Sequence, residues 1–226
     1  MLNWRKSSNF ASKMDSMRYE KEDLEEALRV LRDGGVIVYP TDTVWGIGCD
    51  ATNEEAVRKV FALKQRADSK SMLVLLDSAA KLDYYVEVLP TACLLLEATG
   101  NDGMSARDAS SVSAAKPLNE GKPLTIIYPK ARHLAESLLA EDGSVGIRIT
   151  DEVFSKALCA RLRKPIVSTS ANISGEPAAK CFREIKKEIL DGADYVCRYR
   201  REDESEHEPS SIIKVNEDGS FVIIRS

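Results

Sequence analysis

The sequence lacks the long apolar segments of a membrane protein. No apolar run in its 226 residues approaches the roughly 18 residues that a membrane-spanning helix needs. Hydrophobic residues make up 43% of the chain and charged residues 30%, proportions that are ordinary for a globular protein. We therefore expect no membrane partner.

Cysteine and histidine are too few and too scattered for a zinc site or a disulfide framework. The five cysteines are an odd number, no Cys-x-x-Cys occurs, and the two histidines, His133 and His207, stand far apart. Such a chain fits a reducing compartment, so we expect a cytoplasmic protein. No residue is predicted as a metal ligand.

The chain also has no excess of basic residues. Its formal net charge is -4 at pH 7, so any contact with RNA would depend on a local basic patch. Basic residues do dominate the N-terminal segment, but that segment lacks the amphipathic length of a transit peptide. We interpret residues 1–18 as a disordered tail and residues 19–226 as one domain.

Two common nucleotide-binding fingerprints are absent or misplaced. Gly121-Lys122 is followed by proline and has no glycine five residues earlier, so the chain contains no Walker A loop. Gly46–Ala51 matches the dinucleotide fingerprint G-x-G-x-x-A, but Thr41–Trp45 separates it from the preceding strand and the next helix starts only at Thr52. We interpret these glycines as a tight turn close to a ligand.

The pattern of apolar residues predicts a mixed α/β fold. Helices are expected at Tyr19–Arg32, Thr52–Lys64, His133–Leu139, Asp151–Leu162 and Arg183–Leu190. Strands are expected at Val36–Tyr39, Met72–Leu76, Leu124–Tyr128, Ser144–Ile149, Pro165–Ser168, Tyr195–Arg198, Ile212–Val215 and Phe221–Ile224. Strands outnumber helices and the order is irregular, which favours a mixed sheet. Residues 100–121 are expected to form a long loop, either a functional lid or a disordered segment.

Three groups of polar residues accompany these elements. Lys64 and Arg66 stand at the end of a predicted helix and would suit a polyphosphate, although basic residues also cap helices. Ser170 and Asn172 follow a buried strand and would either hold a phosphate or a ribose or form a turn. Arg148 interrupts an apolar strand, so it needs an anion from the protein or from a substrate.

Read together, these segments resemble the YrdC family of threonylcarbamoyl-AMP synthases. The resemblance rests on five motifs in order, which are Tyr39–Ala51, Lys64-x-Arg66, Gly146–Ile149, Ser168–Gly175 and Pro209–Ile213. Their order and spacing cover about residues 20–226. The resemblance implies a single-domain short form, with a twisted mixed β-sheet flanked by helices around a deep concave cavity.

The resemblance further implies an enzyme that condenses ATP, L-threonine and bicarbonate to threonylcarbamoyl-AMP and pyrophosphate for tRNA modification. Mg²⁺ would accompany ATP. By motif, the ATP-binding residues would be Lys64, Arg66, Ser170 and Asn172, with Lys64 and Arg66 also catalytic. The threonine-binding residues would be Thr41, Thr43, Arg148 and Ser210. Downstream tRNA-modification proteins are the implied partners, and tRNA or double-stranded RNA is a further candidate.

The chain departs from the family pattern beside the nucleotide motifs. Ala67-Asp68 follows Arg66 where a proline is usual, and Lys122–Thr125 replaces the usual proline-glycine-proline. Two alternatives stay open. A non-catalytic RNA-binding or translation-associated protein could use the same concave surface, and a related enzyme could act on a carbamoyl-adenylate without a threonyl product.

Overall fold

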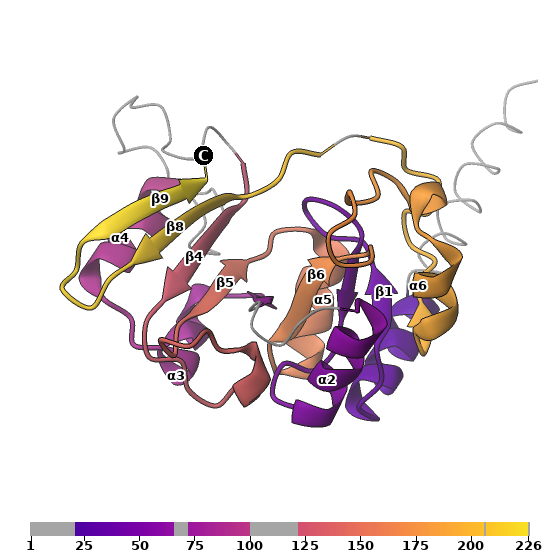
Figure 1. The fold of residues 1–226 in the computed structure, drawn as a ribbon, viewed down its shortest axis with the longest axis horizontal. Coiled ribbons are helices and arrows are strands. Elements are labelled where there is room, and N and C mark those ends of the chain that lie inside the picture. Colours follow the sequence, from indigo (N-terminus) through magenta and orange to yellow (C-terminus); the bar gives the residue numbers. More distant parts are fainter. Residues whose placement is uncertain (1–20, 66–71, 100–121, 206, 226) are drawn as a thin grey trace, which may run out of the picture.

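The structure is a computed structural model that describes residues 21–65, 72–99, 122–205 and 207–225. The predicted tail, the predicted loop at residues 100–121 and Arg66 lie outside the described residues. Figure 1 shows the arrangement of the elements along the chain.

The described strands form one nine-stranded mixed sheet in the order β7-β1-β2-β6-β3-β5-β4-β8-β9. Three neighbouring pairs are parallel, namely β1 with β7, β3 with β5, and β4 with β8, and the other pairs are antiparallel. The mixed sheet that the sequence predicts is thereby confirmed. The strands are β1 (Ile37–Tyr39), β2 (Gly46–Gly48), β3 (Leu73–Leu76), β4 (Leu124–Tyr128), β5 (Val145–Ile149), β6 (Ile166–Ser170), β7 (Tyr195–Val196), β8 (Ser211–Val215) and β9 (Phe221–Arg225).

Helices pack on both faces of this sheet. The described helices are residues 21–32, α2 (Glu54–Leu63), α3 (Leu82–Tyr85), α4 (Pro90–Thr99), α5 (Val153–Leu162) and α6 (Lys187–Gly192). Helix 21–32 and α5 share one hydrophobic core with Ile37 and Tyr39, whereas α2 and α4 share the other with Val38. Successive residues of a strand point to opposite faces, which explains how β1 serves both cores. None of these helices is long and apolar enough to cross a membrane.

The predicted turn at Gly46–Ala51 is wrong in part, because Gly46–Gly48 is strand β2 in the middle of the sheet. A side chain at Gly48 would overlap the carbonyl oxygen of Val167 and come close to the ring of Tyr39. Glycine within a strand often marks such a close approach of neighbouring chain. Gly48 therefore serves packing between strands, whereas Gly46 lines the large cavity.

Three predicted helices differ from the structure. The helix expected at His133–Leu139 is only a 3₁₀ turn at Glu136–Leu138. The helix expected at Arg183–Leu190 is a 3₁₀ turn followed by the short helix α6. Helix α2 begins after Thr52, because the Asn53 side chain caps it by accepting a hydrogen bond from the amide of Ala56 at 3.1 Å.

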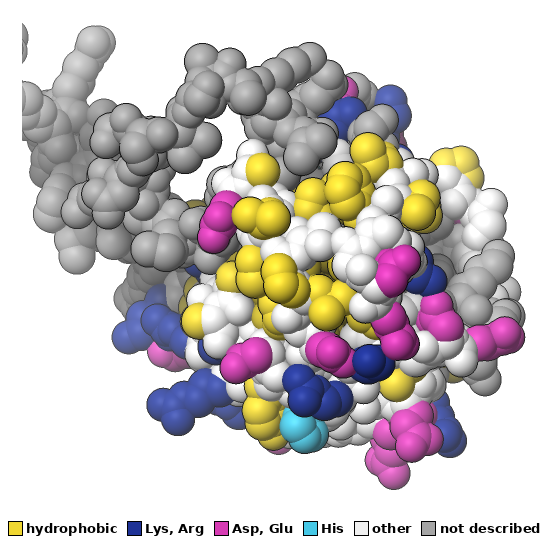
Figure 2. All heavy atoms as spheres, turned by 90° about the vertical axis from the view of Figure 1, so that its left-hand side faces the viewer, with side chains coloured by type: hydrophobic (Ala, Val, Ile, Leu, Met, Phe, Trp, Pro, Cys, Tyr) yellow, Lys and Arg dark blue, Asp and Glu magenta, His cyan; other side chains and the backbone are white. Residues whose placement is uncertain are grey.

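Strand β9 lies at the edge of the sheet beside β8. Its four hydrophobic side chains are exposed, as is Leu94 on α4, with relative exposures between 44% and 64%. Figure 2 shows hydrophobic side chains gathered on this side of the molecule. The strand ends at Arg225, whose side chain belongs to the site described next.

Candidate functional site

A cavity of about 810 Å³ lies along the sheet from β6 to β9. Its volume is in the range of small-molecule sites in proteins. Among the residues that line it are Thr41, Thr43, Arg148, Ser170, Ser210 and Arg225. The structure thus brings five of the sequence-predicted site residues to one cavity although they come from four separate parts of the chain.

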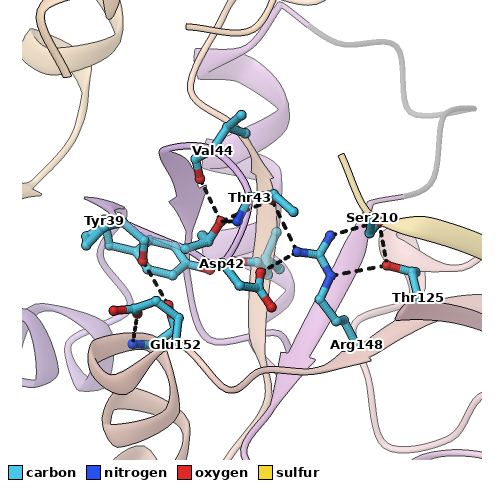
Figure 3. A network of polar contacts seen from close by, with 12 residues as sticks. Tyr39, Asp42, Thr43, Val44, Thr125, Arg148, Glu152 and Ser210 are labelled. Carbon is cyan, nitrogen blue, oxygen red and sulfur yellow. Dashed lines mark hydrogen bonds and ion pairs between the residues drawn. The ribbon is translucent and has the colours of Figure 1, made fainter. Parts of the chain in front are cut away.

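Arg148 is the centre of a polar network at one end of the cavity (Figure 3). Its side chain is only 4% exposed, and its Nη1 lies 2.5 Å from the carboxylate of Asp42. The Nη1, Nη2 and Nε groups also donate to the hydroxyls of Thr43, Ser210 and Thr125, each at 3.2 Å. The sequence left open whether a protein carboxylate or a substrate meets this arginine. The structure provides a protein carboxylate, and the arginine still lines the cavity.

The two threonines that follow β1 shape the loop beside this network. The Thr41 hydroxyl donates to the carbonyl of Val44 at 2.6 Å and accepts from the amide of Thr43 at 3.1 Å. Both threonines are buried, with exposures of 4% and 8%. The Thr41 hydroxyl thus holds the loop, and the Thr43 hydroxyl meets Arg148.

Lys64 lies beneath the loop that follows β6. It is 1% exposed, and its ammonium donates to the carbonyls of Ser170 and Asn172. The Asn172 side chain accepts a hydrogen bond from the Ser170 hydroxyl at 2.5 Å. The structure therefore groups three of the four predicted ATP-binding residues, and of these three Ser170 lines the large cavity. Asn172 lines a smaller neighbouring hollow of about 270 Å³.

The other end of the cavity combines an apolar wall with an ion pair. Leu73 and Ile127 line the wall. The carboxylate of Asp142 pairs with Lys214 at 2.6 Å, and this pair with hydrogen bonds from Ser144 lowers the pKa of Asp142 well below its usual range. This end of the cavity can therefore take the apolar part of a ligand, whereas Arg148 and Arg225 carry positive charge at the opposite end.

Sequence reasoning missed three residues of the site, which are Asp42, Thr125 and Arg225. Asp42 stands inside a motif that was identified for its threonines, and Thr125 belongs to a predicted strand. Arg225 carries the clearest signal, since it directly follows the apolar run Phe221–Ile224. The criterion that singled out Arg148, an arginine in an apolar strand, would have found it as well.

Comparison with protein families finds one match over most of the chain. A family model named for Sua5, YciO and YrdC and described as telomere recombination matches residues 29–226. The threonylcarbamoyl-AMP synthase of Stutzerimonas stutzeri (strain A1501) is 36% identical over 157 residues, which cover 70% of this chain and 74% of that protein. The threonylcarbamoyl-AMP synthase of Vibrio campbellii is 29% identical over 191 residues, 84% of this chain and 93% of that protein.

Solved structures share the fold at lower sequence identity. Escherichia coli YciO superposes with a TM-score of 0.70 at 22% identity and covers 92% of this chain and 89% of its own. The P. abyssi Sua5 complexed with L-threonine has a TM-score of 0.70 at 21% identity, over 89% of this chain and 53% of that one. These likenesses confirm the predicted fold class.

Proposed function

Because the chain belongs to the Sua5/YciO/YrdC family, we propose that it is an L-threonylcarbamoyladenylate synthase, a nucleotidyltransferase that uses ATP, L-threonine and bicarbonate. Curated relatives that carry this activity in their names reach 36% identity over most of their length. The observation that carries the proposal is the cavity itself, which joins the Arg148 network to the Ser170 loop. A site for an amino acid and a site for a nucleotide would then lie in one cavity.

The reaction joins two anions, which explains the cationic side chains. The amine of threonine condenses with bicarbonate to a carbamate with loss of water, and an oxygen of this carbamate attacks the α-phosphorus of ATP. An oxygen–phosphorus bond forms, the bond to the β-phosphate breaks, and pyrophosphate leaves with its electron pair. Fixed positive groups lower the repulsion between the anions and stabilise the charge that develops on the phosphates.

Threonine belongs at the Arg148 end of the cavity. Thr43, Ser210 and Arg148 form a buried set of hydroxyls and a guanidinium that are already oriented by one another. Preorganised groups lose little entropy when a substrate binds, and positioning supplies much of the rate where no covalent nucleophile is needed.

The phosphates of ATP belong near the loop after β6. Ser170 offers its hydroxyl to the cavity, and Lys64 holds the loop through its carbonyls. Lys64 supplies positive charge beneath the loop from a nearly fully buried position. The roles of Lys64, Arg66, Ser170 and Asn172 in ATP binding remain predictions.

Mg²⁺ would arrive with the nucleotide. No group of three or more His, Cys, Asp or Glu side chains in the described part of the chain could hold a metal ion. Mg²⁺ in nucleotide sites keeps several waters and takes most other ligands from substrate phosphates, so the described residues fit an ion carried by ATP. When bound, it would withdraw charge from the phosphate oxygens.

The product would pass to tRNA-modification proteins in the cytoplasm. Threonylcarbamoyl-AMP is a mixed anhydride that hydrolyses, so transfer to a partner must be prompt. Three buried free cysteines, Cys49, Cys159 and Cys197, suit a reducing compartment. A direct role for tRNA or double-stranded RNA stays a candidate without support from the comparisons.

Pyrophosphate release tests the proposal. Purified protein should release pyrophosphate from ATP only when both threonine and bicarbonate are present. RNA binding without turnover would favour the non-catalytic alternative. Turnover with a carbamoyl donor but without threonine would favour a related carbamoyl-adenylate enzyme.

A further inference from the structure

The chain between β7 and β8 connects opposite ends of the strand order. Strand β7 is the first strand of the sheet, next to β1, and β8 is the last but one. Figure 1 shows this connecting segment crossing from the side of α6 to β8. The segment ends at Ser210, in the candidate threonine site. Neither the sequence motifs nor the proposed function assigns a role to the residues that begin it.

Arg200 anchors the start of the connecting segment to the loop that follows β1. Its side chain is 21% exposed, and its Nη1 donates to the carbonyl of Thr41 at 3.3 Å. Its Nε and Nη2 lie 2.8 and 2.7 Å from one carboxylate oxygen of Asp203, and its Nη1 lies 3.9 Å from the carboxylate of Glu152. Contacts between a guanidinium and a carboxylate fix geometry as well as charge. Arg200 is thereby oriented toward the backbone of the loop.

The backbone of Arg200 has the left-handed conformation, with a φ of 61°. For a residue other than glycine this conformation costs free energy, and it persists where the surrounding structure stabilises it. The contacts of the Arg200 side chain with Thr41 and Asp203 provide such stabilisation.

The loop that follows β1 is held through two consecutive backbone carbonyls. The Ser155 hydroxyl of α5 donates to the carbonyl of Pro40 at 2.8 Å, and Arg200 donates to that of Thr41. Thr41 is only 4% exposed, and a buried carbonyl needs such a partner. The same loop brings the hydroxyl of Thr43 to the candidate threonine site. The position of the Thr41 carbonyl therefore affects the geometry of that site.

His207 accepts a further hydrogen bond from Arg200. The Nη2 of Arg200 lies 2.9 Å from the Nε2 of His207. A guanidinium can only donate, so Nε2 must be the acceptor. The imidazole in this contact is therefore neutral, with its proton on Nδ1.

Protonation of His207 would break this contact. A protonated imidazole presents an N–H group to the guanidinium and competes with it for the carboxylate of Asp203. The described charged side chains nearby are those that line the same small hollow, Lys180, Arg200 and Asp203, and the chain neighbour Glu208, which pairs with Lys122 at 3.0 Å. Two of the three in the hollow are cations, so a third positive charge there is unfavourable.

We propose that Arg200 is a positioning residue for the amino-acid substrate, which holds the loop of Thr41 and Thr43 in its binding geometry while neutral His207 orients Arg200. The inference rests on the proposed function and deepens it, because Arg200 acts on the threonine site through the backbone of this loop. The predicted ATP contacts at the loop after β6 do not depend on Arg200. Since histidines change charge near neutral pH, threonine binding weakens as the pH falls.

Calorimetric titration of L-threonine into wild type, Arg200→Ala and Arg200→Lys tests the role of Arg200. Arg200→Ala should bind L-threonine about tenfold more weakly, because the carbonyl of Thr41 loses a charged donor. Arg200→Lys should recover part of the affinity, since its ammonium keeps one charged donor. A non-hydrolysable ATP analogue should bind both variants as it binds wild type.

Arg201→Ala is the matched control. Arg201 also donates to backbone carbonyls, those of Cys197 at 2.7 Å and Val196 at 2.5 Å, and its guanidinium lies over the ring of Phe182. It lines a hollow beside β7 and not the large cavity. Its loss should lower the melting temperature but leave L-threonine affinity unchanged. Wild-type affinity in Arg200→Ala, or an equal loss of affinity in Arg201→Ala, would overturn the inference.

Titration of L-threonine at about pH 8 and about pH 6 gives a readout that a loss of stability alone would not move. L-Threonine keeps both of its charges over this range. Wild type should bind it more weakly at the lower pH, whereas His207→Gln, which offers a neutral acceptor at both, should show no such difference. The same difference in both proteins, or none in wild type, would overturn the inference. Wild-type protein that binds no L-threonine at either pH would instead contradict the proposed function itself.

Discussion

Arg148 and Asp42 form a buried ion pair whose removal has two separable effects. The side chains are 4% and 13% exposed, and their charged atoms lie 2.5 Å apart. Loss of one partner from such a pair leaves the other charge buried and unpaired, whereas loss of both partners together is far less destabilising. Stability and substrate binding can therefore be tested independently at this pair.

We expect Arg148→Ala to lower the free energy of unfolding by about 3–5 kcal/mol and to weaken threonine binding. The double variant Asp42→Ala with Arg148→Ala should regain much of the stability but not the threonine affinity. Urea unfolding and calorimetric titration measure the two effects, and ATP binding should stay largely intact in both variants. A double variant as unstable as Arg148→Ala, or wild-type threonine affinity in either, would contradict this account.

Lys64 and Arg66 belong to one motif but require different tests. The Lys64 ammonium is buried against the carbonyls of Ser170 and Asn172. Alanine at Lys64 should therefore lower both stability and ATP affinity, so it cannot isolate a role in catalysis. A substitution at Arg66 that preserves the charge isolates the geometry of the guanidinium.

We expect Arg66→Lys to lower kcat/KM for ATP by at least about tenfold, or about 1.4 kcal/mol of transition-state stabilisation. Lysine keeps the positive charge but cannot bind a phosphate through a planar fork. The melting temperature should change little, which serves as the control. Full activity of Arg66→Lys would show that the fork is not used.

At the scale of elements, Gly48 of β2 and Gly146 of β5 differ in the space around their Cα atoms. A Cβ at Gly48 would overlap the carbonyl oxygen of Val167, which belongs to the backbone of β6 and cannot yield easily. A Cβ at Gly146 would lie 3.5 Å from Leu73 and Thr125, an ordinary van der Waals contact. Substitution of Gly146 by alanine is therefore a control for the same substitution at Gly48.

We expect Gly48→Ala to destabilise the protein by about 1–3 kcal/mol or more, because the strands must move apart. Gly146→Ala should cost less than about 1 kcal/mol, because nothing has to move. Thermal and urea unfolding of both variants measure the difference. Equal stability of the two variants would show that the close approach of β2 and β6 is unimportant.

The strands that the sequence predicted well are those with a continuous apolar run. Leu124–Tyr128 is predicted to the residue, and Phe221–Ile224 differs from β9 by one. Three described elements were not predicted, of which α3 has only four residues, and the other two were missed for separate physical reasons. Strand β2 is short and rich in glycine, and α4 is apolar on nearly all sides, so it lacks helical periodicity, although Pro90 at its first position is a start signal.

The site was predictable to the extent that it resides in local motifs. Thr41, Thr43, Arg148 and Ser210 stand in such motifs, and the structure brings them together. Arg225 lies at the far end of the chain and reaches Ser210 only through the pairing of β8 with β9. That contact depends on sheet register and could not be derived from the spacing of either motif.

At the scale of the whole molecule, the sheet places the substrate sites in one cavity. The end of β6 and the loop after it contribute the candidate phosphate site, and the candidate threonine site comes from β5, the loop after β1 and the residue before β8. Enclosure matters for this chemistry, because a carbamate loses carbon dioxide and the product hydrolyses in water. We therefore expect all three substrates to meet in this one cavity.

Isotope labelling of the product tests that claim most directly. Purified protein is incubated with ATP, L-threonine and ¹³C-bicarbonate. The nucleotides are then separated, and their masses are determined by mass spectrometry. We predict a threonylcarbamoyl-AMP that carries a single ¹³C and appears in equal amount with pyrophosphate, and none when threonine is omitted. Release of AMP and pyrophosphate without threonine, or of ADP and phosphate in place of the labelled adenylate, would contradict the account.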